Sequence, residues 1–260
     1  MGISRIADTF VANKQAGRKS LIVYISAGDP SLKATASLVK QLSAAGADII
    51  ELGVPFSDPV ADGPVIQAAS YRALAAGASL SKIIQMASAL RKETQIPMVL
   101  MSYYNPLLRY GLANLAADMD KAGVDGLIVP DLPWEESQPL REALARYQLA
   151  GIPLIAPNTP VPRLIRIAAS ASGFIYCVSL TGVTGIRQNI TTGIQEYMER
   201  VRAVSDLPIG VGFGIGSPEQ ASSMAPFCDG IIVGSAVVHT LYEEGEAAVI
   251  KLVKRLKQAI

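Results

Sequence analysis

Short apolar runs alternate with amphipathic segments along most of this chain. One phrase recurs loosely at residues 45–51 (AGADIIE), 122–129 (AGVDGLIV) and 228–234 (CDGIIVG). In each copy a helical pattern ends and a short apolar strand begins, and glycine at such a point accommodates the left-handed end of a helix. Runs that are apolar on both faces are typical of strands buried in a parallel sheet.

The remaining runs extend the same pattern over the whole sequence. Further strands are predicted at residues 21–26, 97–102, 152–156, 174–179 and 208–212, which makes about eight in all. Amphipathic helices are predicted at residues 32–45, 80–91, 112–122, 135–147, 161–171, 193–204 and 247–260. Strands that alternate with helices pair in parallel through crossover connections, and eight such units close a barrel.

We therefore predict an α/β protein, a single (β/α)8 TIM barrel of residues 1–260 that forms one domain with an extra N-terminal helix. The extra helix follows from polar and apolar residues at helical spacing in residues 1–10. An open doubly wound sheet is the alternative. It is disfavoured because residues 26–30 (SAGDP) follow the first strand, where a dinucleotide-binding fold has a G-x-G-x-x-G turn.

Composition restricts the partners. Half of the residues are hydrophobic, and 23 basic residues are balanced by 22 acidic ones without a basic tract, so we expect no nucleic acid partner. No apolar run reaches the ~18 residues of a membrane span, and the N-terminus lacks the apolar core of a secretory signal. The sequence therefore predicts a protein without a membrane partner, located in the cytoplasm or, as a mature form, in a plastid stroma.

The residue inventory also restricts the chemistry. Cys177 and Cys228 have no C-x-x-C spacing and are predicted to be buried thiols, and the sole histidine, His239, lies in a helical apolar pattern. A metal site and a histidine-based triad are therefore not expected. No lysine ends a predicted barrel strand, which disfavours Schiff-base catalysis. The remaining candidates for proton transfer at strand ends are Glu51, Asp62, Asp131 and Tyr176.

Residues 51–64 (ELGVPFSDPVADGP) are the strongest candidate for an active-site loop. They follow an apolar strand and place Glu51 at its carboxyl end, where α/β barrels concentrate their chemistry. The segment is rich in glycine and proline and supplies a second carboxylate, Asp62. The alternative for Glu51 is a structural carboxylate held by an arginine or by a backbone amide.

The last three loops after strands are rich in small residues. They are residues 181–185 (TGVTG), 212–217 (GFGIGS) and 233–236 (VGSA). Glycine lets backbone amides approach a ligand, and barrels often bind phosphate after the last two strands. The three loops together indicate a phosphate site. The alternative is that they are ordinary turns with helix caps, and Ser217 has the sequence context of a cap.

Four segments resemble the tryptophan synthase alpha subunit family, and the resemblance runs from end to end. They are residues 51–67 (ELGVPFSDPVADGPVIQ), 129–136 (VPDLPWEE), 174–185 (FIYCVSLTGVTG) and 210–216 (GVGFGIG). The resemblance implies a (β/α)8 barrel that cleaves indole-3-glycerol phosphate to indole and glyceraldehyde 3-phosphate. It also implies an α2β2 assembly in which indole passes to a beta subunit. Pyridoxal phosphate is expected in that beta subunit and no cofactor in this chain.

The resemblance also assigns roles to residues. Glu51 would act as the acid, and also as the base, while Asp62 would stay ionised and accept a hydrogen bond from the indole N–H; Tyr176 would lie beside the substrate. The implied phosphate contacts are Gly185, Gly214, Gly234 and Ser235. The implied indole pocket is Tyr24, Met101, Leu127 and Phe213, and Thr184 would reach Asp62 from a lid of residues 180–190. The residues expected to face the beta subunit are Asp58, Pro59, Tyr104, Asn105 and Asp131.

Three other functions are alternatives. A lyase that works alone and releases free indole would have the same fold and residues. Another phosphate-binding barrel of histidine or tryptophan biosynthesis would have no reason to contain the segment from Glu51 to Asp62. A barrel that only regulates a partner is disfavoured because both carboxylates are present.

Overall fold

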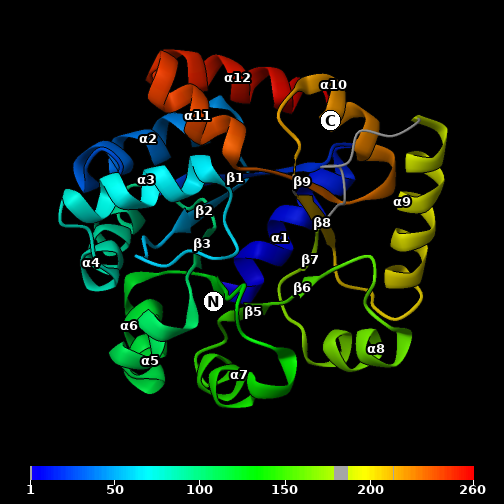
Figure 1. Cartoon of the computed structure of the whole chain (residues 1–260), viewed down its shortest axis with the longest axis horizontal. Helices are drawn as coiled ribbons and strands as arrows, with labels where there is room; N and C mark the ends of the chain where they lie inside the picture. The colour runs from blue at the N-terminus through cyan, green and yellow to red at the C-terminus, as the bar shows by residue number, and fades with distance from the viewer. Residues whose placement is uncertain (1, 179–186, 213) are drawn as a thin grey trace.

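The centre of the molecule is a parallel sheet ringed by helices (Figure 1). The computed structural model describes residues 2–178, 187–212 and 214–260. The strands are β1 (Ser20–Ser26), β2 (Ile49–Gly53), β3 (Met98–Met101), β4 (Gly126–Ile128), β5 (Ala150–Ile152), β6 (Leu154–Ile155), β7 (Ile175–Val178), β8 (Ile209–Gly212) and β9 (Gly230–Val233). The helices are α1 (Gly2–Gln15), α2 (Leu32–Ala45), α3 (Pro64–Ala75), α4 (Leu80–Arg91), α5 (Tyr104–Tyr110), α6 (Leu112–Ala122), α7 (Gln138–Ala145), α8 (Val161–Ser170), α9 (Arg187–Arg202), α10 (Pro218–Met224), α11 (Ser235–Glu244) and α12 (Glu246–Gln258), with short 3-10 helices η1 (Trp134–Glu136) and η2 (Ala225–Phe227).

The sheet closes through one interrupted strand. Its order is β5-β4-β3-β2-β1-β9-β8-β7-β6, so the two ends of the sheet are β5 and β6. Only Pro153 separates these two strands, and its carbonyl accepts a hydrogen bond from the Tyr176 N–H at 3.0 Å. Proline has no N–H to donate, so the hydrogen-bond ladder is interrupted there. β5 and β6 together form the fifth strand of a barrel, which confirms the predicted (β/α)8 TIM barrel.

Helix α1 covers the amino-terminal end of the barrel, and the predicted extra helix is therefore present. Its Ile6 and Phe10 are buried in the cluster that fills the barrel interior, together with Ile22 and Phe174. The rings of Phe10 and Phe174 lie 5.6 Å apart. In Figure 1, α1 lies across the centre of the ring of helices. The end of the barrel with the amino ends of the strands is thus filled by apolar side chains from α1.

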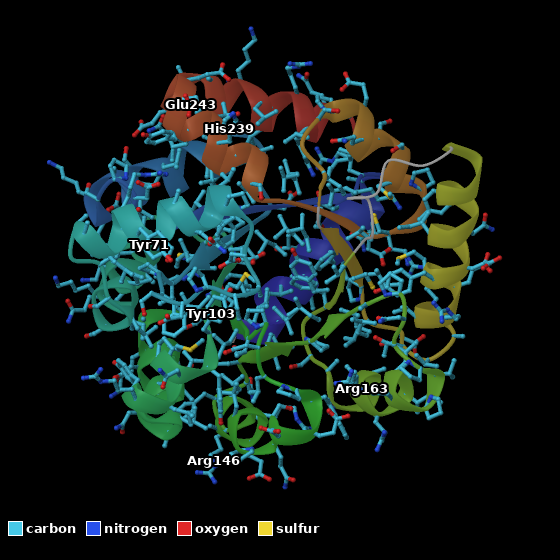
Figure 2. The ribbon with its side chains drawn as sticks, viewed as in Figure 1. Tyr71, Tyr103, Arg146, Arg163, His239 and Glu243 are labelled. Carbon is cyan, nitrogen blue, oxygen red and sulfur yellow. The ribbon has the colours of Figure 1, made fainter. Side chains whose placement is uncertain are left out.

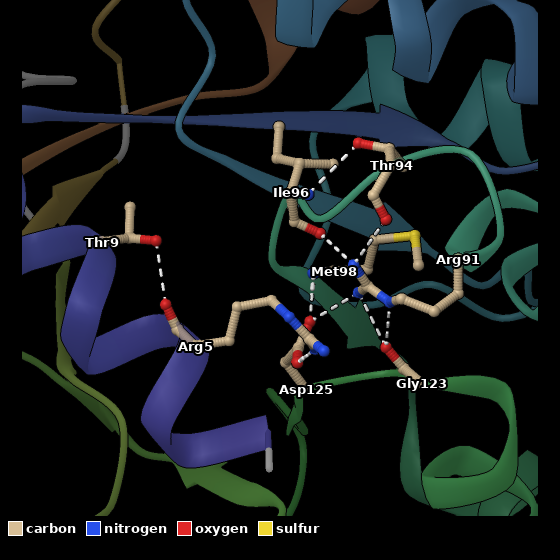
Figure 3. Close-up of polar contacts among 8 residues, drawn as sticks. All are labelled: Arg5, Thr9, Arg91, Thr94, Ile96, Met98, Gly123 and Asp125. Atoms are coloured by element: carbon tan, nitrogen blue, oxygen red, sulfur yellow. Dashed lines mark hydrogen bonds and ion pairs between the residues drawn. The ribbon is translucent and has the colours of Figure 1, made fainter.

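A buried ionic cluster holds α1 against the barrel (Figure 3). Asp125, at the start of β4, is fully buried and forms ion pairs with Arg5 of α1 and Arg91 of α4, the latter at 2.8 Å. It also accepts a hydrogen bond from the Met98 N–H at 2.8 Å, while Arg91 donates to the Gly123 carbonyl. A buried carboxylate requires partners of this kind, because its loss of hydration is otherwise uncompensated.

No single helix among the described residues is long and apolar enough to cross a membrane. The pair α3 and α4 meets that test by length and composition only, with a bend of 90° between the helices. No group of three His, Cys, Asp or Glu side chains in the same residues could hold a metal ion.

Replacing Asp125 by Asn should lower the free energy of unfolding by about 3–5 kcal/mol, because two guanidinium groups lose their buried counterion. Urea unfolding at neutral pH measures the change. The matched control is Glu93→Gln, which breaks an exposed ion pair with Lys40 that spans 2.9 Å. We expect the control to change stability little, and equal losses in the two variants would contradict the anchoring role of Asp125.

Candidate active site

A cavity of about 260 Å³ opens at the carboxyl ends of the strands. Residues of β1, β2, β3, β7 and β9, of the loops before α3, α10 and α11, and of the first turns of α3 and α11 line it. The lining residues are Tyr24, Glu51, Ala61, Asp62, Gly63, Ile66, Met101, Tyr176, Gly214, Ile215, Gly216, Ile232, Gly234, Ser235 and Ala236. The structure therefore brings together most of the residues that the sequence proposes for catalysis, phosphate binding and the indole pocket.

Glu51 is a buried acid. It lies on β2, is 1% exposed, and its Oε2 atom has no hydrogen-bond partner among the described residues. Burial, together with a smaller effect of the nearby charge of Asp62, raises the pKa of Glu51 to about 8. No arginine or backbone amide of the described residues pairs with this oxygen, so the structural alternative for Glu51 gains no support there. At neutral pH the side chain holds a proton that it can donate.

Asp62 has a different environment. It is half-buried in the loop before α3, and its Oδ2 accepts a hydrogen bond from the Tyr103 hydroxyl at 3.0 Å. The same hydroxyl accepts from the Ala61 N–H at 2.9 Å, and the Tyr103 ring stacks on Phe56. Burial raises the pKa of Asp62, while the hydrogen bond from Tyr103 opposes this rise. The two carboxyl groups of the cavity thus differ: a hydrogen bond from Tyr103 stabilises the charged form of Asp62, and Glu51 Oε2 has no such bond among the described residues.

Tyr103 is a residue beside the candidate site that the sequence reasoning missed. Its neighbour Tyr104 is assigned to the partner-facing surface, but Tyr103 is the buried one and lies on the inner side of the ring of helices (Figure 2). One sequence feature could have identified Tyr103: it lies two residues after the end of β3, and β3 is the neighbour of the strand that carries the candidate loop, β2. Adjacent parallel strands bring such positions together.

Two buried tyrosines, Tyr24 on β1 and Tyr176 on β7, also line the cavity with Glu51. Burial raises the pKa of both phenols well above its ordinary value, so both remain hydrogen-bond donors. A Cβ atom on Gly53 would collide with the Tyr24 hydroxyl, and one on Gly212 with the Tyr176 hydroxyl. Glycine at the ends of β2 and β8 therefore provides the space in which the two phenols lie.

Gly214, Gly234 and Ser235 form a small-residue rim of the cavity, where backbone N–H groups lie close to the cavity. Gly234 is the N-cap of α11 without a side-chain cap, and Gly214 has a φ of +81°. The first N–H groups of a helix have no partner within that helix and attract anions. Ser217 differs, because it forms a capping box with Gln220 and so is the predicted cap of α10. Gly185, Thr184 and Phe213 lie outside the described residues.

The structure corrects the assignment of Leu127 to the indole pocket. Leu127 packs in the outer layer between strands and helices and lines a different cavity. Its neighbour Ile128 belongs to the cluster inside the barrel. Successive residues of a strand face opposite sides, so the inward position in β4 belongs to Ile128.

The proposed partner-facing residues follow β2, β3 and β4 at the same end of the barrel. Asp58, Asn105 and Asp131 are exposed, Tyr104 is half-buried, and Pro59 is buried. The Tyr104 N–H donates to Asp131 at 2.9 Å, which joins two of the loops.

The remaining residues of the inventory lie outside the cavity. His239 is exposed on α11 (Figure 2). Cys177 and Cys228 are free and buried, and burial raises the pKa of each thiol to about 12. None of the three has the environment of a reactive group.

A (β/α)8 barrel with a protonated glutamic acid and an aspartate in one strand-end cavity defines an enzyme with acid–base chemistry. The profile of the family "Tryptophan synthase alpha chain" matches residues 10–259. A tryptophan synthase alpha chain of Geobacter sulfurreducens is 46% identical over 99% of both chains, and one of Carboxydothermus hydrogenoformans is 48% identical over 92% of this chain and 90% of that chain.

Solved structures agree with these relatives. Tryptophan synthase subunit alpha from Legionella pneumophila superposes with a TM-score of 0.91 at 38% identity, covering 98% of each chain. A tryptophan synthase chain from M. tuberculosis, in an aminoacrylate-bound form, gives a TM-score of 0.90 at 36% identity over 98% of this chain and 99% of that chain. This chain belongs to the tryptophan synthase alpha chain family, and the resemblance read from its sequence is confirmed.

Replacing Tyr103 by Phe should raise the pKa of Asp62, because the hydrogen bond that favours its charged form is lost while burial remains. NMR titration of ¹³C-labelled aspartate measures the shift. Tyr110→Phe is the matched control, since it removes a hydroxyl that donates to Asp118 instead. The same Asp62 pKa in the parent and in the Tyr103 variant would show that this hydroxyl does not hold the carboxylate.

Proposed function

We propose that this chain is the alpha subunit of a tryptophan synthase and cleaves indole-3-glycerol phosphate to indole and glyceraldehyde 3-phosphate. The observation that carries the proposal is the pairing of a protonated Glu51 with Asp62 in one cavity. Membership of the alpha chain family supports the substrate and the reaction.

The reaction requires two proton transfers at neighbouring atoms. Glu51 donates its proton to C3 of the indole ring, which places a positive charge on the ring nitrogen. The bond between C3 and the glycerol carbon then breaks, and its electron pair restores the aromatic ring. The hydroxyl on that carbon becomes the aldehyde carbonyl and gives its proton to the Glu51 carboxylate, which regenerates the acid. A pKa of about 8 suits a group that must donate and accept near neutral pH.

Asp62 stabilises the cationic intermediate. As a carboxylate it accepts a hydrogen bond from the indole N–H and offsets the charge that develops on the nitrogen. The Tyr103 hydroxyl supports this state by favouring the charged form of Asp62. Tyr24 and Tyr176 place two neutral phenols beside the ring, and Met101 supplies an apolar contact.

The phosphate group occupies the small-residue rim. Gly214, Gly234 and Ser235 line the cavity, and the first turn of α11 offers backbone N–H groups to an anion. Gly185 completes this set by resemblance. The helix dipole of α11 favours the same negative charge. The substrate thus lies with its phosphate at α11 and its indole ring between Glu51 and Asp62.

A beta subunit binds the face that follows β2, β3 and β4, in an α2β2 assembly. The exposed side chains of Asp58, Asn105 and Asp131 support this face, as does Val60, which is 84% exposed in the loop that also carries Asp62. Pyridoxal phosphate belongs to the beta subunit, and this chain requires no cofactor for the cleavage. A cytoplasmic or stromal location stays a prediction.

Glu51→Gln and Asp62→Asn should each reduce indole release from indole-3-glycerol phosphate by about 10²–10⁴-fold, the usual contribution of a positioned acid or base. A steady-state assay of indole formation measures the loss. Glu93→Gln, an exposed carboxylate in the ion pair with Lys40, is the control and should keep the parent rate. Activity of either site variant close to that of the parent would refute the assignment.

Adding a tryptophan synthase beta subunit should yield a complex on gel filtration and accelerate the cleavage. Asn105→Arg should weaken the complex, because a bulky charge enters the proposed face. Arg146→Glu, at the end of α7, serves as the charge-changing control. A chain that cleaves the substrate but neither co-migrates with the beta subunit nor changes its rate would favour the lyase that works alone.

A further inference from the structure

A second cavity, larger than the candidate active site, lies between α7 and α8. Its volume is about 370 Å³, which falls within the range of small-molecule sites. Apolar side chains from β4, α7, β6 and α8 form most of its wall. These are Leu127, Leu140, Leu144, Leu154 and Ile167. The cavity reaches Pro153, where the fifth strand is interrupted, so it adjoins the point at which the barrel closes.

Trp134 forms a fixed aromatic part of this wall. Its indole N–H donates to Ser170 Oγ at 2.6 Å, and its carbonyl accepts from Ser137 Oγ at 2.7 Å. The guanidinium groups of Arg141 and Arg166 lie 5.2 and 5.6 Å from its ring centre. The ring is therefore held by contacts from α7 and α8 and does not depend on a ligand for its position.

The charged side chains of the cavity wall differ in their partners. Three charged residues line it, namely Asp131, Arg141 and Arg163. Arg163 is paired with Glu135 through two contacts at 3.0 and 3.2 Å, and Asp131 accepts from the Tyr104 N–H. Among the described residues, Arg141 makes one hydrogen bond, from Nε to Ser137 Oγ at 3.0 Å, and has no carboxylate partner. Its two terminal nitrogens are available to an anion.

We propose that this cavity binds a small monocarboxylate with an apolar, aromatic body. The apolar wall and Trp134 receive the body, and the Arg141 guanidinium receives the carboxylate, because its planar fork matches the two carboxylate oxygens. One guanidinium with both terminal nitrogens available matches one carboxylate group on the ligand. This site is separate from the cavity that holds Glu51 and Asp62, and the two cavities have no lining residue in common.

The chain carries its own probe for the test, because Trp134 is its only tryptophan. Titration with 3-phenylpropionate should change the tryptophan emission in a saturable way, and equilibrium dialysis of the same probe should give the same affinity. The neutral analogue 3-phenylpropionamide should bind at least about tenfold more weakly, since it lacks the charge-assisted contact. No saturable binding of 3-phenylpropionate, or equal affinity for the amide, would overturn the proposal.

Substitutions of Arg141 test whether the probe binds in this cavity. Arg141→Gln should weaken dialysis-measured binding by about tenfold, while Arg141→Lys, which keeps the charge, should lose less. Dialysis is used here because the guanidinium lies beside the Trp134 ring and its removal alters the emission directly. Arg146→Gln, on the outer edge at the end of α7 (Figure 2), should bind like the parent. Unchanged affinity in Arg141→Gln would contradict the proposed site.

Discussion

The burial of the Glu51 carboxyl group is the constraint on which the rest of the site depends. Its pKa of about 8 in the folded chain lies above the ordinary 4.5, so the folded state keeps a proton that the unfolded state releases. Between these two pH values the folded state binds more protons, and stability therefore falls as the pH rises through this window and stays lower above it. The burial that keeps Glu51 protonated for the reaction therefore lowers the stability of the folded state at higher pH.

The barrel separates the elements that stabilise it from those that react. Its amino-terminal end is filled by α1 and held by the buried cluster around Asp125, where each charge has a partner. Its carboxyl-terminal end contains an unpaired carboxyl oxygen, two buried phenols and glycines that make room for them. Because the buried polar side-chain atoms without partners in the described part of the chain lie at the second end, the apolar and ionic contacts at the first end can offset their cost.

Most of the fold could be predicted from the sequence because each buried strand is a short apolar run that follows a helix. The fifth strand was less readable, since Pro153 divides it and shifts its apparent start. Helix α3 was not predicted, because it begins at the end of the loop assigned to chemistry, where Gly63 and Pro64 mark a helix start as readily as a turn. The short helix α5 contains Pro106 and has too few turns for a clear period.

The sequence predicted those site residues whose place relative to a strand end is enough to indicate a role. Glu51 and Asp62 were found because one ends a strand and the other lies in the loop that follows it. Leu127 was misplaced because the three residues of β4 are all buried, so no alternation shows which side faces inward. The role of Tyr103 depends on the distance from its hydroxyl to a loop 41 residues away, which only the folded chain reveals.

The most direct test of this account is the protonation of Glu51 in the free chain. NMR titration of ¹³C-labelled glutamate side chains, with the Glu51 signal identified by its absence in Glu51→Gln, measures its midpoint. The account predicts a midpoint near pH 8, far from that of exposed glutamates. A midpoint near the ordinary 4.5 would mean that Glu51 is ionised at neutral pH, and it would contradict the acid on which the proposed cleavage depends.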